Sequence, residues 1–238
     1  MKRSEINRII READSFIESH GFLLPPFAHW TPQQWRDRGQ DAIAIAAHQL
    51  GWDITDFGSG DYTNCGLFLF TVRNGHPDNL KTLKGPLYAE KLLIVLEGQV
   101  TPFHFHWNKT EDIINRGGGR LVLELFNSGP NFETLETEVS VLTDGVRRTL
   151  SAGGRVTLEP GESITLPTTL HHQFWAEGGT VLVGEVSNVN DDHSDNHFLT
   201  PVGRFPQIEE DEEPFRLLYN DYPRYYRFAG SLEPGGYG

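Results

Sequence analysis

Residues 98–118 read GQVTPFHFHWNKTEDIINRGG, and most of what the sequence predicts starts from this stretch. His104 and His106 lie two positions apart in a segment of strand-like composition, so both side chains point to one face and Phe105 points to the other. Glu111 follows five residues after His106, far enough for the chain to bend and bring a carboxylate to the same point. Imidazole and carboxylate groups together suit Mn, Fe, Zn, Co or Ni. The stretch therefore predicts half or more of a metal site.

A second segment with histidines, residues 161–172, reads GESITLPTTLHH. Its pattern is that of a strand, then a turn that begins at Pro167, and then two adjacent histidines. In a small barrel this strand would lie opposite the first one and supply a fourth ligand. The residues alone leave open whether His171 or His172 is that ligand.

The chain around these segments changes its pattern at Gly51. Before it, apolar residues such as Ile6, Ile10 and Ile17 recur at helical spacing, and Thr31 precedes a proline as a helix cap would. After it, short apolar runs alternate with Gly, Asn, Asp and Pro; the runs are residues 67–72, 91–96, 121–126, 139–142, 156–158, 164–166 and 181–186. We predict a helical extension at residues 1–50 and one antiparallel β-barrel or sandwich domain at residues 51–238, which ends in a long loop and an aromatic tail.

Composition narrows the classes of function. The chain has 238 residues and a net charge of −13, which argues against a nucleic acid as its main partner. No apolar run is long enough to span a bilayer, and the first residues have no apolar core of a signal peptide. Cys65 is the one cysteine, so the chain cannot form an internal disulfide. We expect a cytoplasmic protein with no membrane partner.

The two segments with histidines resemble the two signatures of the cupin superfamily. The first signature matches at all of its fixed positions, which are Gly98, His104, His106, Glu111 and Gly118. The second signature matches at Gly161, Pro167 and His172. Thr169 replaces a glycine of this second signature, and Ala176 replaces an asparagine. The resemblance implies a mainly β cupin barrel (a double-stranded β-helix, or jelly roll) with an N-terminal helical extension. It also selects His172 over His171 as the fourth ligand.

The resemblance extends to one family of cupins. The stretch YAEKLLIVLEGQVTPFHFHWNKTEDIINRGGG, followed later by VNDDHSDN and GRFPQIEEDEE, is similar to the D-lyxose ketol-isomerases over nearly the whole chain. The family implies a metal-dependent aldose–ketose isomerase that interconverts D-lyxose and D-xylulose, with D-mannose and D-fructose as a second pair, through an enediolate. It also implies one Mn²⁺ per chain, with Co²⁺, Fe²⁺ or Ni²⁺ as substitutes, and a homodimer.

Candidates for substrate binding lie close to the predicted ligands. Lys109 sits between His106 and Glu111, so it must lie near the ion, where it could donate to a sugar oxygen or act as acid or base. Lys91 belongs to the preceding strand and is expected to reach the same cavity. Arg204 is expected to bind sugar hydroxyl groups. We expect Glu111 to contact both the ion and the sugar.

Two carboxylates are candidates for the catalytic base. Glu185 interrupts the apolar run of residues 181–186, and a carboxylate there costs free energy unless it is paired or functional. Glu209 lies in an acidic loop that we expect to fold over the mouth of the barrel. The sequence does not choose between them.

Three alternatives to the isomerase remain at this stage. A set of three histidines and one glutamate is also compatible with a non-haem iron dioxygenase. A cupin could hold a metal and a sugar without turnover. A different sugar isomerase or an epimerase would share the enediolate and differ only in pocket contacts, because one fold hosts many chemistries.

Overall fold

A computed structural model describes residues 1–192, 194–204 and 206–230 of the chain. The helices are α1 (Arg3–Ser19), α2 (Pro32–Asp37), α3 (Ile43–Ala47), α4 (Pro77–Thr82) and α5 (Tyr222–Tyr225). Short 3-10 turns are η1 (Pro26–His29), η2 (Gln40–Ala42) and η3 (Tyr219–Asp221). Thr31 caps α2 as the sequence predicts, because its side chain accepts a hydrogen bond from Gln34 N and Gln34 bonds back to its N–H.

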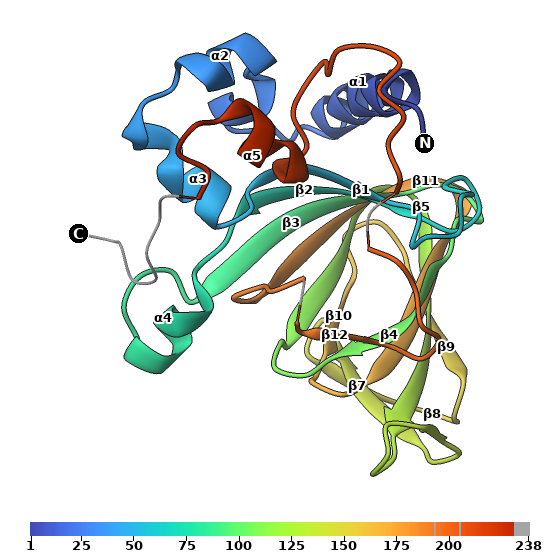
Figure 1. Cartoon of the computed structure of the whole chain (residues 1–238). Coiled ribbons are helices and arrows are strands. Elements are labelled where there is room, and N and C mark those ends of the chain that lie inside the picture. The colour runs from blue at the N-terminus through green and yellow to red at the C-terminus, as the bar shows by residue number, and fades with distance from the viewer. Residues whose placement is uncertain (193, 205, 231–238) are drawn as a thin grey trace.

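The strands form one connected antiparallel sheet that closes into a barrel (Figure 1). They are β1 (Gly51–Thr55), β2 (Leu67–Arg73), β3 (Tyr88–Val95), β4 (Thr101–His106), β5 (Glu111–Ser128), β6 (Thr134–Leu135), β7 (Val139–Thr143), β8 (Val146–Leu150), β9 (Gly154–Leu158), β10 (Ser163–Leu166), β11 (His171–Asn188) and β12 (Asn196–Phe198). The main order is β1-β2-β3-β11-β5-β10-β7-β8; β4 pairs with β11 and β12, and β9 with β5. The predicted mainly β jelly-roll barrel is confirmed.

Two long strands, β5 and β11, belong to both walls of the barrel. Residues 181–188 of β11 pair with β3, whereas its first residues pair with β4, and β5 follows β11 on both sides of the bend. The bend passes through Gly118, which has a φ of +96°. A Cβ atom at Gly118 would lie 2.0 Å from the carbonyl oxygen of Thr180, so this position requires glycine. The bend brings the start of β11 opposite β4.

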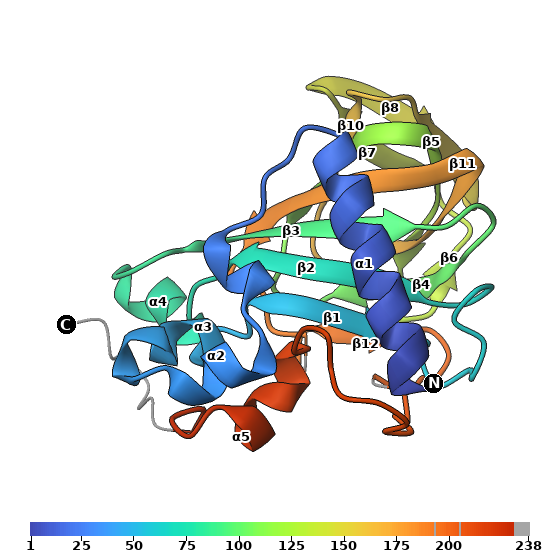
Figure 2. The same ribbon diagram turned by 90° about the horizontal axis from the view of Figure 1, so that it is seen from above.

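The core has two main parts, one on each face of the β1–β3 wall. Inside the barrel, leucine and valine side chains of β2, β3, β5, β9 and β11 pack together. On the outer face, α1 lies across β1, β2 and β3, as Figure 2 shows. There Ile6, Ile10 and Ile17 of α1 pack with Phe68 and Phe70 of β2. Each of these buried side chains stabilises the fold by about 1.5–3 kcal/mol.

The C-terminal tail fixes the helical extension in place. Arg3, whose side chain is fully buried, binds both oxygens of Glu210 at 2.8 Å and both oxygens of Asp221 at 3.0 and 2.9 Å. Trp35 of α2 packs with Tyr222 and Tyr226 of the tail. The N-terminal helices and the tail therefore form one packed layer, and the division at residue 51 stays a prediction. Residues 231–238, the end of the predicted domain and its tail, lie outside the described residues.

The described residues contain no helix with the length and apolar character that a membrane crossing requires.

Candidate active site

Three histidines meet at the point where β4 and β11 pair. His104 and His106 alternate along β4, and His172, the second residue of β11, lies directly opposite His104 in the register. One nitrogen from each ring lies within 4.8 Å of the others. All three side chains are buried. The structure thus brings together the three histidines that the sequence selects, and they could hold a metal ion.

Hydrogen bonds to the backbone set which nitrogen of His104 and which nitrogen of His172 can bind a metal. Nδ1 of His104 lies 2.8 Å from the carbonyl oxygen of Pro102, and Nδ1 of His172 lies 2.9 Å from that of Leu170. A carbonyl oxygen only accepts hydrogen bonds, so both Nδ1 atoms carry the proton, and Nε2 keeps its lone pair. Nε2 of His172 is buried and makes no hydrogen bond within the described residues, although a carboxylate oxygen of Glu111 lies beside it. This is the arrangement found around metal-binding histidines.

Burial keeps His104 and His106 neutral. Burial lowers the pKa of His104 well below its usual value, and the neighbouring imidazoles of His172 and His106 lower it further. Burial also lowers the pKa of His106, with a further lowering by the charge of Lys109. Neutral imidazoles are the form that binds metal, because a protonated ring has no free lone pair. The donor set therefore fits a divalent ion.

Glu111, the first residue of β5, faces the same point. Its Oε1 atom lies 3.2 Å from Nε2 of His106 and 3.3 Å from Nε2 of His172. Burial alone would raise the pKa of Glu111, but the charge of Lys109 and the imidazole of His106 hold the pKa well below its usual range. An ionised carboxylate oxygen thus lies beside two inward-facing imidazole nitrogens.

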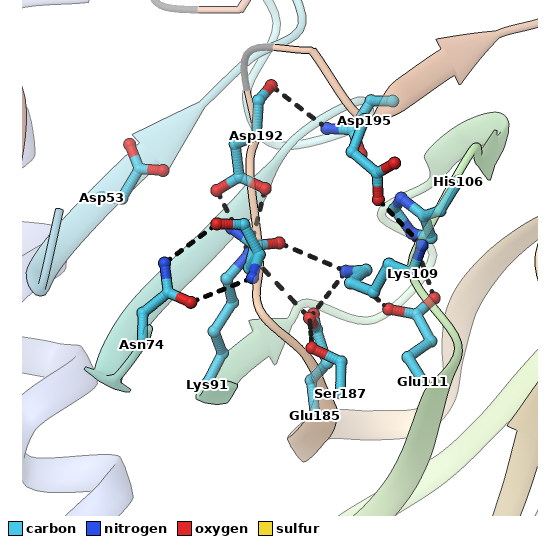
Figure 3. Close-up of polar contacts among 12 residues, drawn as sticks. Asp53, Asn74, Lys91, His106, Lys109, Glu111, Glu185, Ser187, Asp192 and Asp195 are labelled. Carbon is cyan, nitrogen blue, oxygen red and sulfur yellow. Dashed lines mark hydrogen bonds and ion pairs between the residues drawn. The ribbon is translucent and has the colours of Figure 1, made fainter. Parts of the chain in front are cut away.

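Lys109 joins this centre to a second carboxylate (Figure 3). Its Nζ atom lies 2.8 Å from Glu111 Oε2, 2.7 Å from Glu185 Oε1 and 3.3 Å from Asn190 Oδ1. An ammonium group has three hydrogens to donate, and these three oxygens can accept all of them. Burial would lower the pKa of Lys109, but the charges of Glu111 and Glu185 raise it above its usual value. Lys109 is therefore a fixed cation and not a neutral amine.

Glu185 lies in the wall opposite Lys91, as the β11–β3 register requires. Besides Lys109, its Oε1 atom has Lys91 Nζ at 3.9 Å and the hydroxyl of Ser187 at 3.5 Å. The side chains of Glu185 and Lys91 are both almost fully buried and line the cavity. Glu185, the residue that interrupts the apolar pattern of β11, thus faces inward to charged partners.

The far end of the cavity contains a second set of charges. Lys91 Nζ binds both oxygens of Asp192 at 3.0 and 3.1 Å, and Arg204 lies between Asp192 and Asp53. Burial would raise the pKa of Asp192, but Lys91 and Arg204 hold it well below its usual value. For Asp53 burial prevails, and its pKa is raised although Arg204 opposes the change. The predicted residues Lys91 and Arg204 both line this cavity.

Glu209 does not reach the cavity. Its side chain is exposed, and its backbone pairs with the start of α1, where its carbonyl oxygen accepts a hydrogen bond from Arg3 N at 2.8 Å. The neighbouring residues Glu210 and Asp211 bind Arg3 and Ser4 of α1. The acidic loop, which we expected over the barrel mouth, is instead held at the N-terminus because α1 offers it partners there.

Four polar residues of the site have no counterpart in the sequence-based prediction, namely Asp53, Asn190, Asp192 and Asp195. The last three lie in VNDDHSDN, and such runs of Asp and Asn more often form turns. Asp53 could have been found from the sequence, because it is a charged residue between the apolar residues Trp52 and Ile54. The strand that contains it is buried throughout. A charge in such a strand is paired or functional.

The cavity between the two ends also has an apolar wall. Leu67, Leu69, Leu93 and Phe174 line it together with the polar residues. The arrangement offers a cation-binding centre, an adjacent carboxylate held by a lysine, and a distal set of donors and acceptors. Chemically, it suits proton transfer on a small polyhydroxylated molecule.

Comparisons with known sequences agree with this chemistry. The family model described as D-lyxose isomerase matches residues 1–222. A D-lyxose/D-mannose isomerase from Escherichia coli O157:H7 is 48% identical over 228 residues, which cover 94% of this chain and 100% of the relative. One of the same name from Serratia proteamaculans is 50% identical over 229 residues, covering 94% and 99%.

Solved structures share the fold. L-ribose isomerase from Cellulomonas parahominis aligns with a TM-score of 0.59 at 16% identity, covering 88% of this chain and 98% of that one. L-ribose isomerase from Acinetobacter sp. DL28, in complex with L-ribose, aligns with a TM-score of 0.58 at 16% identity and the same coverage. At this identity the likeness concerns the fold alone.

Proposed function

Because the chain belongs to the D-lyxose isomerase family, we propose that this sugar isomerase interconverts D-lyxose with D-xylulose, and D-mannose with D-fructose. The names of the two curated relatives support D-lyxose and D-mannose as the two aldoses. Family membership favours this reaction over the dioxygenase and over binding without turnover. The polar contacts of the cavity fit a sugar chain that has hydroxyl groups at both ends.

The observation that carries the proposal is the position of Glu185 beside the histidine centre. Glu111 and Glu185 both bind the ammonium group of Lys109, one on the side of the imidazoles and one on the side of the open cavity. An aldose–ketose isomerase needs a base that removes a proton from one carbon and returns it to the next. Glu185 has the chemistry and the location for that step.

The metal ligands in this proposal are His104, His106, His172 and Glu111. When bound, a divalent ion there supplies Lewis-acid polarisation of the sugar carbonyl and its neighbouring oxygen. We propose manganese on the family resemblance, and the mixed nitrogen and oxygen donor set is compatible with it. The same donor set also accepts cobalt, nickel or iron.

The residues of the chain divide the remaining work. Glu185 takes the proton from C2 of the aldose and delivers it to C1. The proton of the hydroxyl group on C2 passes to the oxygen on C1, and the two transfers together give the ketose through an enediolate. Lys109 holds Glu185 in place, and its fixed charge favours the negative charge that develops on the sugar oxygens. Lys91 and Arg204, with Asp192, bind the hydroxyl groups at the other end of the sugar. The apolar wall keeps water away from the intermediate.

Two further properties are part of the proposal. A homodimer is supported by the family resemblance. A cytoplasmic location is supported by the presence of a single cysteine, since structural disulfides are rare in reducing compartments.

The direct test is incubation of the manganese-loaded protein with D-lyxose and with D-mannose in deuterated water, followed by NMR. We expect D-xylulose and D-fructose to appear, and deuterium to enter the carbon that receives the proton. An oxygen electrode run in parallel should show no consumption. Absence of ketose with either sugar, at full metal occupancy, would contradict the proposed function.

A further inference from the structure

Asn74 lies directly after β2 and is buried, although the proposed mechanism gives it no task. Its side-chain Oδ1 accepts a hydrogen bond from Asn190 N at 2.9 Å, and its Nδ2 donates to the carbonyl oxygen of Asn190 at 2.9 Å. Nδ2 also lies 3.4 Å from the carbonyl oxygen of His48. One amide group therefore holds both backbone groups of a single residue.

The backbone of Asn190 needs these bonds because it has left the sheet. Strand β11 ends at Asn188, and Asn190 is buried two residues later. Buried N–H and C=O groups without partners cost about 1–3 kcal/mol each. The Asn74 amide replaces the pair of bonds that a neighbouring strand would give. In Figure 3, Asn74 lies on the same side of the site as Lys91, and dashed lines mark its hydrogen bonds.

The segment that follows β2 lies close to the segment that follows β11. A Cβ atom at Gly75 would lie 2.1 Å from the carbonyl oxygen of Pro86 and 2.7 Å from Cγ2 of Val189. The pair Asn74-Gly75 suggests a hairpin turn in the sequence, but in the structure it leads from β2 towards α4. Glycine permits the contact, and asparagine makes the bonds.

Asn190, whose backbone is held by Asn74, also binds Lys109. Its side-chain Oδ1 accepts the third hydrogen bond of the ammonium group at 3.3 Å. Asp195, five residues later, holds the other end of the same lysine, because its carboxylate accepts from Lys109 N at 3.1 Å and from Asn108 N at 2.7 Å. The segment after β11 thus fixes both the backbone and the head group of Lys109, and Asn74 ties that segment to β2.

We propose that Asn74 is a positioning residue of the isomerase: through Asn190 it holds the ammonium group of Lys109 between Glu111 and Glu185. The inference rests on the proposed function. Asn74 touches neither the sugar nor the metal ligands, so its loss should change turnover and leave binding of both nearly intact.

The test compares Asn74→Ala with the matched control Asn127→Ala in the manganese-loaded protein. Asn127 also uses its side-chain amide to hold a backbone carbonyl, that of Glu138 at 2.9 Å, and it does not line the cavity. We expect kcat for D-lyxose to fall at least about 10-fold in Asn74→Ala, since small displacements of catalytic groups have such effects. KM and metal content should change less than about two-fold, and Asn127→Ala should keep the kcat of the wild type.

Asn190→Ala keeps the backbone contact with Asn74 and removes the bond to Lys109, which is the side-chain hydrogen bond that Asn190 makes among the described residues. We expect it to lower kcat as Asn74→Ala does, and the double variant to be no slower than the slower single variant. If Asn74→Ala does not fold, Asn190→Ala carries the test.

Three outcomes would overturn the inference. Asn74→Ala could be less stable and yet keep its kcat, Asn190→Ala could be fully active, or the two losses could simply add. An active wild type with any of these results refutes the inference alone, whereas a wild type that isomerises neither sugar refutes the proposed function and the inference together.

Discussion

The two ends of the cavity differ in the side chains that line them and in whether those side chains already have partners. At the histidine end, backbone carbonyl oxygens accept hydrogen bonds from the imidazoles of His104 and His172 and leave their other nitrogens facing inward. At the far end, Lys91 and Arg204 are held by Asp192 and Asp53, and the charges of these groups compensate one another. The first end is prepared for a cation that is not part of the chain. At the second end the charged groups already have partners within the chain. A sugar hydroxyl group must therefore compete with these ion pairs, which favours selectivity over affinity.

The largest effect is expected at Glu185, where the two ends meet. Glu185→Gln keeps the shape and removes the charge, so the variant cannot accept a proton, and we expect kcat to fall by about 10²–10⁴-fold. Turnover of D-lyxose at verified metal occupancy measures this. The matched control is Glu209→Gln, since Glu209 is exposed and lies outside the cavity. If both variants were equally active, Glu185 would not be the catalytic base.

The next effect concerns the histidine end and separates two neighbours in the sequence. His172→Gln removes an inward nitrogen, and we expect manganese affinity to fall by more than about 100-fold, which is the upper effect of losing an outer-shell partner. His171 points elsewhere, with Nε2 2.9 Å from the carbonyl oxygen of Phe132. His171→Gln should therefore keep its metal. Metal analysis after dialysis, with calorimetric titration, decides between them, and loss of metal in His171→Gln alone would reverse the assignment.

The far end should be more sensitive to acid than to metal removal. Asp192 has a pKa below its ordinary 3.8, so its ion pairs contribute stability above about pH 4 that is lost as the pH falls towards the native pKa. We expect Asp192→Asn to lower the free energy of unfolding by about 2 kcal/mol at pH 7, and by less below pH 4.

Urea unfolding of the metal-free wild type and of Asp192→Asn at several pH values measures this difference. A difference that stays constant from pH 7 to pH 3 would show that Asp192 contributes through packing and not through charge.

The smallest effect tests the turn that leads into β11. Thr169 has a φ of +60°, a conformation that is strained for a β-branched residue, and its N–H donates to the carbonyl oxygen of His106 at 2.9 Å. Thr169→Gly should raise the free energy of unfolding by about 1 kcal/mol, because relief of strain exceeds the entropic cost of glycine. Thermal unfolding measures this, and a lower midpoint would mean that threonine makes a compensating contact.

How much of this could be predicted depends on how far apart the interacting residues lie in the chain. His104 and His106 were predictable because the two-residue period of a strand fixes their common face. Thr169, which replaces the signature glycine, adopts a left-handed conformation of the kind that glycine favours, and the spacing to His172 is kept. The strand runs were also visible, but the bends that lengthen β5 and β11 were not, since glycines interrupt the apolar pattern there.

The far end was less accessible to prediction. Lys91 and Asp192 are 101 positions apart, and Arg204 and Asp53 are 151 apart, so no local pattern joins them. The acidic run at residues 209–213 shows the same limit. Its charges suggested a solvated loop or a cover for the barrel mouth, whereas its real partners, Arg3 and Ser4, lie at the other terminus.

The buried Arg3 has a consequence for how the protein is made. Its partners Glu210 and Asp221 come 207 and 218 residues later, so at about 5–20 residues per second they leave the ribosome some 10–40 seconds after it. During that interval the guanidinium group must stay hydrated, and the start of the first helix lacks its native partners. Emergence of residues 210–221 is therefore the event that permits native burial of Arg3, and chains that stop short of residue 221 should be targets for proteolysis.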